Sequence, residues 1–276
     1  RRIPARLPRP KQHIGGPQRG AGHPTVISLP PHPVPAARVD DTKAAALNFL
    51  FEGFAPEDTL REAVRSTLTG QLALVSSFGA ESIVLLHMIS KIDATTPIIF
   101  LDTEMLFPET LTYQREVAAL LGLKDIRIIR ANREDVAQMD PDGRLHEANK
   151  DLCCALRKSK PLAKAISNFD GWITGRKRYQ SEVRAALPKF ETDGDGRLKL
   201  NPLIDWGQKK TRDYINAHEL PLHPLVARRY PSIGCEPCTS KTKPGEDARA
   251  GQWRDQSKTE CGIHFSGGTS IRRRTN

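Results

Sequence analysis

Leu72-Ala-Leu-Val-Ser-Ser-Phe-Gly-Ala-Glu-Ser82 is the stretch of sequence that decides the fold. It begins with a short, uninterrupted apolar run, which is typical of a strand buried on both faces of a parallel sheet. Small residues then lead into a helical pattern that begins near Glu81. The free N–H groups and the dipole at the start of such a helix favour an anion. The alternative is a turn that needs Gly79 only for its backbone geometry.

Further β-rich runs alternate with helical patterns along residues 40–204. Strands are expected at 72–76, 97–101, 126–130, 171–174 and, from a weaker pattern, 198–204; helices are expected at 43–51, 56–68, 81–91, 108–121 and 151–167. Because the first four strands are nearly all apolar, we expect them to be buried on both faces. The alternation predicts an α/β fold with a doubly wound, mostly parallel sheet. Ligands of such sheets bind at the carboxyl ends of the strands.

Two further strand ends carry polar residues suited to an anionic nucleotide. The second strand ends in Asp102 and Thr103, where Asp102 is either a ribose or adenine ligand or only a cap. The fourth strand is followed by Gly175 and then by the basic run Arg176, Lys177 and Arg178. Because this run follows a buried strand directly, it is better suited to a phosphate or a sulfate than to a solvated surface.

The five cysteines divide into four that suit a metal centre and one that stands alone. Cys153 and Cys154 are adjacent, and Cys235 and Cys238 form a Cys-x-x-Cys motif. Adjacent cysteines on a helix point about 100° apart, so they bind one metal ion poorly. An iron-sulfur cluster accommodates them because each thiolate can bind a different iron, which favours [4Fe-4S] over an all-cysteine zinc site.

Cys261 lies near the C-terminus, in a stretch with little secondary-structure signal. Lys258 and His264 are close enough in sequence to lower the pKa of this thiol if they fold toward it. We therefore expect residues 241–276 to form a mobile segment that carries a reactive thiol, and residues 39–240 to form the main domain. An idle thiol is the alternative.

The positive charge of the chain is concentrated near its two ends. The net charge is +10, but residues 1–38 hold seven Arg or Lys, no acid and nine of the 21 prolines. Residues 39–271 hold 32 basic and 32 acidic residues. We therefore expect a disordered basic arm at 1–38 and a body that does not bind nucleic acid. No stretch suggests a membrane span or a secretory signal, which predicts a cytoplasmic protein.

The ordered set of motifs resembles the iron-sulfur branch of the APS/PAPS reductase family, the assimilatory adenylyl-sulfate reductases. The resemblance covers residues 40–265 and has six parts, namely SSFGAES at 76–82, LDTEMLFPET at 101–110, the cysteine pair with Arg157-Lys158, GRKRYQS at 175–181, GCEPCT at 234–239 and ECGIH at 260–264. It implies the adenine-nucleotide alpha-hydrolase (pyrophosphatase-loop) type of sheet. It also implies that Cys153, Cys154, Cys235 and Cys238 hold a [4Fe-4S] cluster and that Cys261 is the nucleophile.

The reaction implied by the resemblance is the reduction of adenosine 5'-phosphosulfate (APS) to sulfite and AMP. Cys261 attacks the sulfur, AMP departs, and thioredoxin or glutaredoxin releases sulfite from the S-sulfocysteine. The residues that the resemblance assigns to substrate binding are Ser76, Ser77, Phe78, Gly79, Glu81, Ser82, Asp102, Thr103, Lys158, Gly175, Lys177, Arg178, Arg249 and His264.

Two positions depart from the usual family pattern, and other functions stay open. Tyr179 stands where the family commonly has Asp, and Gln252 stands where an arginine is expected. A reductase that uses PAPS, alone or together with APS, is the nearest alternative. A pyrophosphatase-loop tRNA sulfurtransferase is more remote, because Phe78 and Glu81 depart from its Ser-Gly-Gly-x-Asp-Ser motif. A zinc-stabilised binding module would leave the strand-end motifs and ECGIH unexplained.

Overall fold

The computed structural model describes residues 40–252, 254 and 262–264. These residues belong to one compact unit, Val34–Asn276. The arm expected at 1–38, the nucleophile Cys261 and most of the segment expected at 241–276 beyond Arg254 lie outside the described residues.

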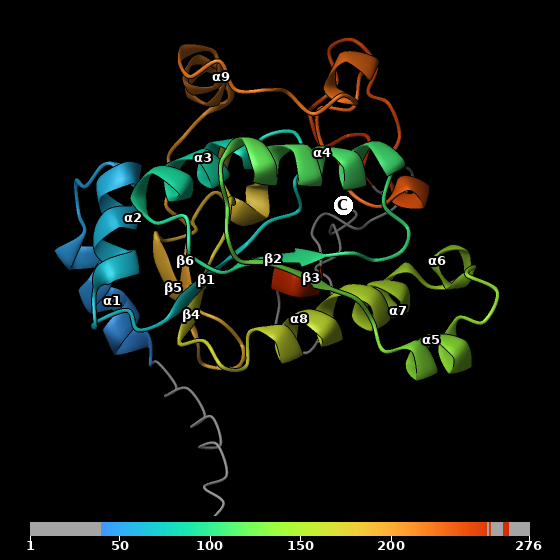
Figure 1. The fold of residues 1–276 in the computed structure, drawn as a ribbon, viewed down its shortest axis with the longest axis horizontal. Helices are drawn as coiled ribbons and strands as arrows, with labels where there is room; N and C mark the ends of the chain where they lie inside the picture. The colour runs from blue at the N-terminus through green and yellow to red at the C-terminus, as the bar shows by residue number, and fades with distance from the viewer. Residues whose placement is uncertain (1–39, 253, 255–261, 265–276) are drawn as a thin grey trace, which may run out of the picture. The chain divides into compact units, whose positions relative to one another are not determined.

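Within the described residues, six strands form one sheet in the order β3-β2-β1-β4-β6-β5 (Figure 1). All neighbours are parallel except β5 and β6, which pair antiparallel. The predicted α/β fold with a mostly parallel sheet is confirmed, and the sequence patterns missed only the short edge strand β5. The strands are β1 (Leu72–Val75), β2 (Ile98–Leu101), β3 (Ile126–Ile129), β4 (Gly171–Ile173), β5 (Phe190–Thr192) and β6 (Leu198–Leu200).

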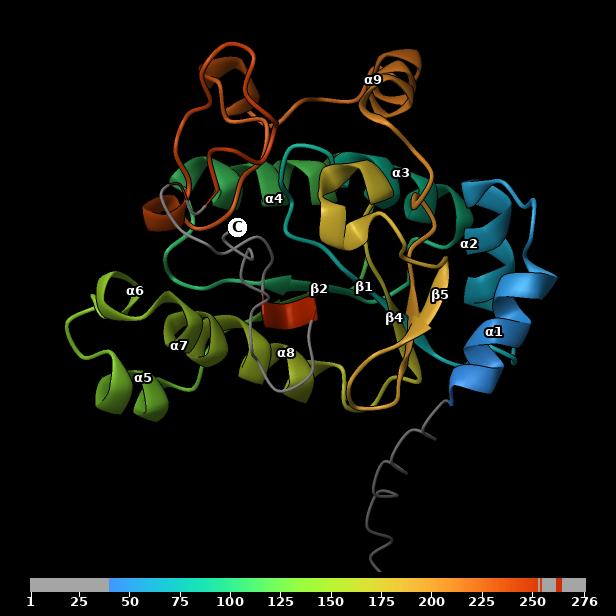
Figure 2. The same cartoon turned by 180° about the vertical axis from the view of Figure 1, so that it is seen from behind.

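Helices cover both faces of the sheet, as Figure 2 shows from behind. Pro56 and Pro108 stand at the starts of α2 and α4, where a missing N–H costs nothing. The side chains of Asp40 and Asn149 cap α1 and α7. The α-helices are α1 (Asp41–Leu50), α2 (Pro56–Arg65), α3 (Ser82–Ile92), α4 (Pro108–Leu120), α5 (Arg133–Met139), α6 (Leu145–Ala148), α7 (Lys150–Cys154), α8 (Lys160–Ala165) and α9 (Gln208–Ala217).

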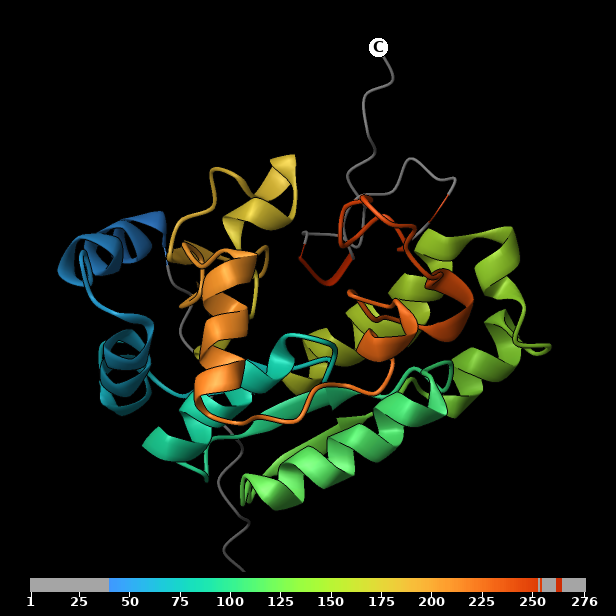
Figure 3. The same ribbon diagram turned by 90° about the horizontal axis from the view of Figure 1, so that it is seen from above.

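Alternate residues of the central strands feed two separate cores. Leu72 and Leu74 of β1 pack with α1–α4 and α9, whereas Ala73 between them packs with α8 on the other face. The same alternation places Ile98 and Phe100 in the first core and Ile99 in the second. Period-two alternation between two buried faces explains why these strands are apolar throughout. Figure 3 shows α9 (orange) beside α3 (teal) on the face of the first core.

The prediction that the strand at 126–130 is buried on both faces is wrong. β3 lies at the edge of the sheet, and the side chain of Ile128 is 49% exposed. Arg127 of this strand lies over the ring of Phe169, so a long polar side chain covers part of the apolar surface. An apolar run alone cannot distinguish an edge strand from a central one.

The helix predicted at 151–167 is present as one continuous helical stretch, Lys150–Ala165, that contains a π-helical turn. α7 ends at the cysteine pair, a π-helical turn follows at Ala155–Ser159, and α8 continues from Lys160. α5, α6 and α9 were not predicted. None of the described helices combines the length and the apolar character needed to cross a bilayer.

The path of the chain fixes where a ligand can bind. From β1 the chain passes through α3 to β2 and through α4 to β3, and it then returns through α5–α8 to β4 on the other side of β1. The crevice between the carboxyl ends of β1 and β4 is therefore the topological switch point of the sheet, where open α/β sheets bind ligands.

Candidate functional site

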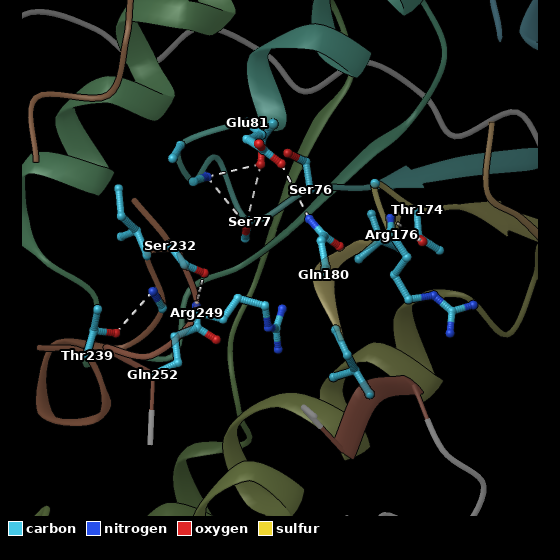
Figure 4. Close-up of a pocket in the computed structure, with 18 of the residues that line it drawn as sticks. Ser76, Ser77, Glu81, Thr174, Arg176, Gln180, Ser232, Thr239, Arg249 and Gln252 are labelled. Carbon is cyan, nitrogen blue, oxygen red and sulfur yellow. Dashed lines mark hydrogen bonds between the residues drawn. The ribbon is translucent and has the colours of Figure 1, made fainter. Parts of the chain in front are cut away.

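A cavity of about 280 Å³ opens at this switch point (Figure 4). Loops from distant parts of the chain line it, and Figure 4 shows Ser77 and Glu81 from the loop after β1 facing Arg176 and Gln180 from the turn after β4. The predicted site residues in its wall are Ser76, Ser77, Gly79, Glu81, Ser82, Thr103, Lys158, Gly175, Lys177, Cys235, Cys238 and Arg249.

Internal hydrogen bonds shape the loop after β1. Ser76 Oγ accepts from the N–H of Phe78 at 3.2 Å, and Ser82 Oγ accepts from the N–H of Gly79 at 3.1 Å. Phe78 has a φ of 49°, and its ring is fully buried against Phe100. A Cβ atom on Gly79 would lie 3.3 Å from the carbonyl oxygen of Ile233, so glycine permits this close approach. The Phe78 side chain therefore anchors the loop in the core and does not line the cavity.

The turn after β4 presents a different set of cations from the predicted one. Arg176 and Lys177 line the cavity, although both are at least nine-tenths buried. Arg176 pairs with Glu191 of β5, and Lys177 Nζ lies 2.8 Å from Glu81 Oε2. Arg178 points elsewhere, because it donates to the carbonyl oxygen of Leu187 and pairs with Asp205. The assignment of Arg178 to the substrate, which the resemblance implied, therefore does not fit this cavity, whereas Arg176, which was not assigned, lies in its wall.

In the loop after β2, the side chains of Asp102 and Thr103 point to different places. Asp102 pairs with Arg130 at 2.8 Å, accepts from the N–H of Glu104 at 3.0 Å and does not line the cavity. This geometry is a local turn in the loop and not a helix cap, because α4 begins only at Pro108 after Phe107. Thr103 lies in the wall, where its Oγ1 is 3.1 Å from Cys235 Sγ.

The Cys-x-x-Cys turn docks on this same loop. Cys235 forms an antiparallel bridge with Leu106, and the N–H of Glu236 donates to the carbonyl oxygen of Met105 at 2.8 Å. The main chain therefore fixes where the Cys235 thiol lies, beside the cavity.

Cysteines from the two motifs influence one another. Burial raises the pKa of the Cys153 thiol to about 11, and the charges of Cys235 and Cys238 act in the same direction. Cys154 is also buried, and the four cysteines in the described part of the chain form no disulfide. In that part no three Cys, His, Asp or Glu side chains are placed to hold a single ion. A metal that binds here must displace the thiol protons.

The π-helical turn after the cysteine pair sends two basic side chains to different places. Arg157 is buried, and its Nη2 lies 2.8 Å from Asp140 Oδ2. Its Nη1 donates to the carbonyl oxygen of Thr103 at 3.0 Å. Lys158 lines the cavity. π-Bulges often occur at functional sites, and this one joins the cysteine pair to the cavity wall.

The segment after Cys238 supplies the rest of the wall. Arg249 and Gln252 line the cavity, and Gln252 Nε2 donates to Ser232 Oγ at 2.6 Å. Arg254 pairs with Glu246 at 2.7 Å and is not part of the wall. Gln252, which stands where the family pattern has an arginine, is thus a wall residue.

Residues Gly262–His264 form a short 3₁₀ turn against the π-helical turn. Ile263, two residues after Cys261 in the sequence, lines the cavity. Cys261 and the side chain of His264 lie outside the described part of the chain, so their assigned roles stay predictions.

Comparison with known proteins gives a consistent result. Residues 71–241 match the family model described as the phosphoadenosine phosphosulfate reductase domain. A protein of Mesorhizobium japonicum named adenosine 5'-phosphosulfate reductase is 45% identical over 94% of each chain. A Gloeobacter violaceus protein named phosphoadenosine 5'-phosphosulfate reductase is 40% identical over 83% of this chain and 97% of its own. The crystal structure of a Candida auris PAPS reductase, a phosphate complex, is 29% identical with a TM-score of 0.64, and the match covers 75% of this chain and all of that one.

Proposed function

Because the chain belongs to the phosphoadenosine phosphosulfate reductase family, we propose that it reduces adenosine 5'-phosphosulfate to sulfite and AMP. The observation that carries this proposal is that one cavity joins the strand-end loops of β1 and β4 to the segment with Cys235 and Cys238. In this proposal, the strand-end loops bind the nucleotide, and the segment with the cysteines lies beside its sulfur-containing group. The relative from Mesorhizobium japonicum, which matches over nearly its whole length, supports the choice of substrate.

In the proposed reaction, Cys261 is the nucleophile. Its thiolate attacks the sulfur of the phosphosulfate, the S–O bond to the phosphate breaks, and AMP leaves with the electron pair. A thiolate of a dithiol protein, thioredoxin or glutaredoxin, then attacks Cys261 Sγ and expels sulfite. The second thiol of this partner resolves the mixed disulfide, so the two electrons come from the dithiol.

The cavity wall supplies the groups that stabilise the leaving phosphate. The loop at 76–82 leads directly into the start of α3, where the first helical turn and the helix dipole favour an anion. Lys158 and Arg249 add positive charge to the same wall. Such groups accelerate the reaction when they lie where negative charge develops. Arg178, which pairs with Asp205 outside the wall, has no part in this proposal.

We also propose that Cys153, Cys154, Cys235 and Cys238 bind a [4Fe-4S] cluster. The donor set fits, because Cys153, Cys154 and Cys235 are buried, and the charges of Cys235 and Cys238 help to raise the pKa of Cys153. In a cluster each thiolate binds its own iron, so the four need not converge on one point. The chemistry that a bound cluster would supply is an electrostatic influence on the sulfate, next to Lys158. Absorbance at roughly 400 nm distinguishes a cluster from zinc.

The test of the proposed function is the Cys261→Ser variant, assayed anaerobically for sulfite release from APS with thioredoxin. Sulfite formation should be lost, while AMP binding and the visible spectrum stay as in the wild type, because this residue is outside the proposed ligand set. Turnover of a few per cent of wild type would contradict the assignment of the nucleophile.

Reduction of PAPS is the second candidate function. The Gloeobacter violaceus relative carries that name, and Arg176 and Lys177 bring two cations to the wall. Parallel measurements of kcat/KM for APS and PAPS decide between the two substrates.

The reducing partner and the location of the protein belong to the same proposal. Thioredoxin is favoured because an S-sulfocysteine needs a dithiol to release sulfite. A cytoplasmic location agrees with the four free cysteines among the described residues, since reducing compartments keep thiols unpaired.

A further inference from the structure

The carboxylate of Glu81 is held at both of its oxygens. Glu81 comes from the loop after β1, directly before α3, and lines the cavity. Lys177 Nζ donates to Oε2 at 2.8 Å, and the hydroxyl of Tyr179 donates to Oε1 at 2.8 Å. Gln180 Nε2 lies 3.4 Å from Oε2 on the same side (Figure 4). Three donors from the turn after β4 thus fix one acceptor from the loop after β1, across the switch point.

At this part of the wall, the arrangement presents the Glu81 carboxylate to a ligand as an acceptor, because the Lys177 cation is already paired with it. The Lys177 side chain is only 2% exposed, and its charge is paired with Glu81. A second phosphate on the ligand would have to displace Glu81 in order to reach Lys177. A carboxylate has about four acceptor positions, and the three donors leave one of them for a donor from the ligand.

Ribose hydroxyls are donors of the right kind. In dinucleotide-binding folds a carboxylate accepts from a ribose hydroxyl, whereas a phosphate at that position needs a basic partner. A fixed carboxylate therefore favours a hydroxyl over a phosphate by attraction to one and repulsion of the other.

Tyr179 supplies the hydrogen bond to Oε1, the oxygen of Glu81 that Lys177 does not hold. It can do so only while its hydroxyl is protonated, because a phenolate has no proton to donate. The tyrosine hydroxyl keeps its proton, because burial and then the charge of Glu81 raise its pKa.

We propose that Tyr179 is a positioning residue, which holds the Glu81 carboxylate as an acceptor for a ribose hydroxyl. This pair makes the cavity prefer an adenosine nucleotide with free ribose hydroxyls over one that carries an additional ribose phosphate. The inference rests on the proposed function, because it takes the cavity to be the nucleotide site.

The test is equilibrium binding of AMP and of adenosine 3',5'-bisphosphate, measured by calorimetry on the purified protein. Neither ligand carries sulfate, so the readout is independent of reductase activity. The wild type should bind AMP more tightly. Tyr179→Phe keeps the ring but removes one hydrogen bond to a charged group, so the preference for AMP should fall by about tenfold.

Two further variants complete the experiment. Tyr230→Phe is the matched control: this tyrosine packs edge to face with Phe107, is outside the cavity wall, and should keep the wild-type preference after substitution. Glu81→Gln keeps the shape of the acceptor but removes the charge that repels a phosphate. It should lower the preference at least as much as Tyr179→Phe, and it provides the test if Tyr179→Phe does not fold.

The outcomes separate this inference from the proposed function. If the wild type prefers AMP and both Tyr179→Phe and Glu81→Gln keep that preference, the inference is wrong while the nucleotide site stands. Equal affinity of the wild type for both nucleotides also overturns the inference alone. If the wild type binds neither nucleotide, the proposed function fails and the inference falls with it.

Discussion

The buried ion pair between Asp140 and Arg157 provides the sharpest test of how the cysteine region is built. The Asp140 side chain is fully buried, and the Arg157 side chain is 6% exposed. Arg157 Nε and Nη2 donate to Asp140 Oδ2 at 3.0 and 2.8 Å, while Oδ1 accepts from the N–H of Leu145. Asp140→Asn would remove the charge and leave the amide with a single acceptor oxygen. At least one buried donor would then lose its partner.

The size of the effect follows from what remains around Arg157. Breaking a buried ion pair by removing one partner costs about 3–5 kcal/mol. Glu104 Oε2 is 3.4 Å from Arg157 Nη1 but belongs to a side chain that is 47% exposed, so it compensates only in part. We therefore expect Asp140→Asn to lower the free energy of unfolding by about 3 kcal/mol.

Urea denaturation followed by circular dichroism measures this loss. With a slope of about 3 kcal/mol per molar urea, the midpoint should fall by about 1 M. Asp213→Asn is the matched control, because its pair with Lys209 has a similar length, 2.7 Å, but side chains that are 58% and 86% exposed. That control should change stability by less than about 0.5 kcal/mol. A similar small change in Asp140→Asn would refute the reasoning.

Three other predictions concern stability and the extent of the active chain. Burial lowers the pKa of His223 to about 4, below the unfolded value near 6.5, so the unfolded state takes up a proton before the folded state does. The free energy of unfolding should be at its full value above pH 6.5 and fall by about 3 kcal/mol as the pH drops toward 4. Thermal melting at pH 7 and pH 5 measures this fall, which should be smaller in His223→Gln. Gly171→Ala should cost about 2–3 kcal/mol in urea, because a Cβ atom there would lie 2.5 Å from the carbonyl oxygen of Leu198; an unchanged midpoint would contradict the packing of β4 against β6. A chain that begins at Asp40 should keep its activity and melting temperature, since residues 1–38 carry no motif residue; a large loss of either would show that the arm contributes to the body.

The sequence was sufficient for features that depend on local pattern. Apolar runs located the strands that lie inside the sheet, and Pro56 and Pro108 marked helix starts, because these signals act over a few residues. The motifs at the ends of β1 and β4 came together as predicted, since parallel strands bring their carboxyl ends to one edge.

Features that depend on the direction of a side chain were not accessible from sequence. Of the basic run after β4, the resemblance assigned Lys177 and Arg178 to the substrate, but it is Arg176 that lines the cavity with Lys177, while Arg178 pairs with Asp205. The edge position of β3 depends on strand order, which an apolar run does not encode. The π-helical turn after Cys154 contains Arg157, whose buried side chain pairs with Asp140, a partner 17 residues away. A local helical pattern does not show such a long-range partner.

The charged side chains of the cavity wall come from two sides, the sheet and the segments that carry the cysteines. On the sheet side, Arg176 and Lys177 are each paired with a carboxylate, Glu191 and Glu81, so their fields largely cancel for a ligand at a distance. Lys158 and Arg249 come from the two segments that carry the cysteines. Under the proposed function, these segments bring positive charge to the phosphosulfate, whereas Glu81 and Lys177 lie on the sheet side of the same cavity. We therefore expect a change in the cysteine region to weaken binding of the anion more than it alters the choice of nucleoside.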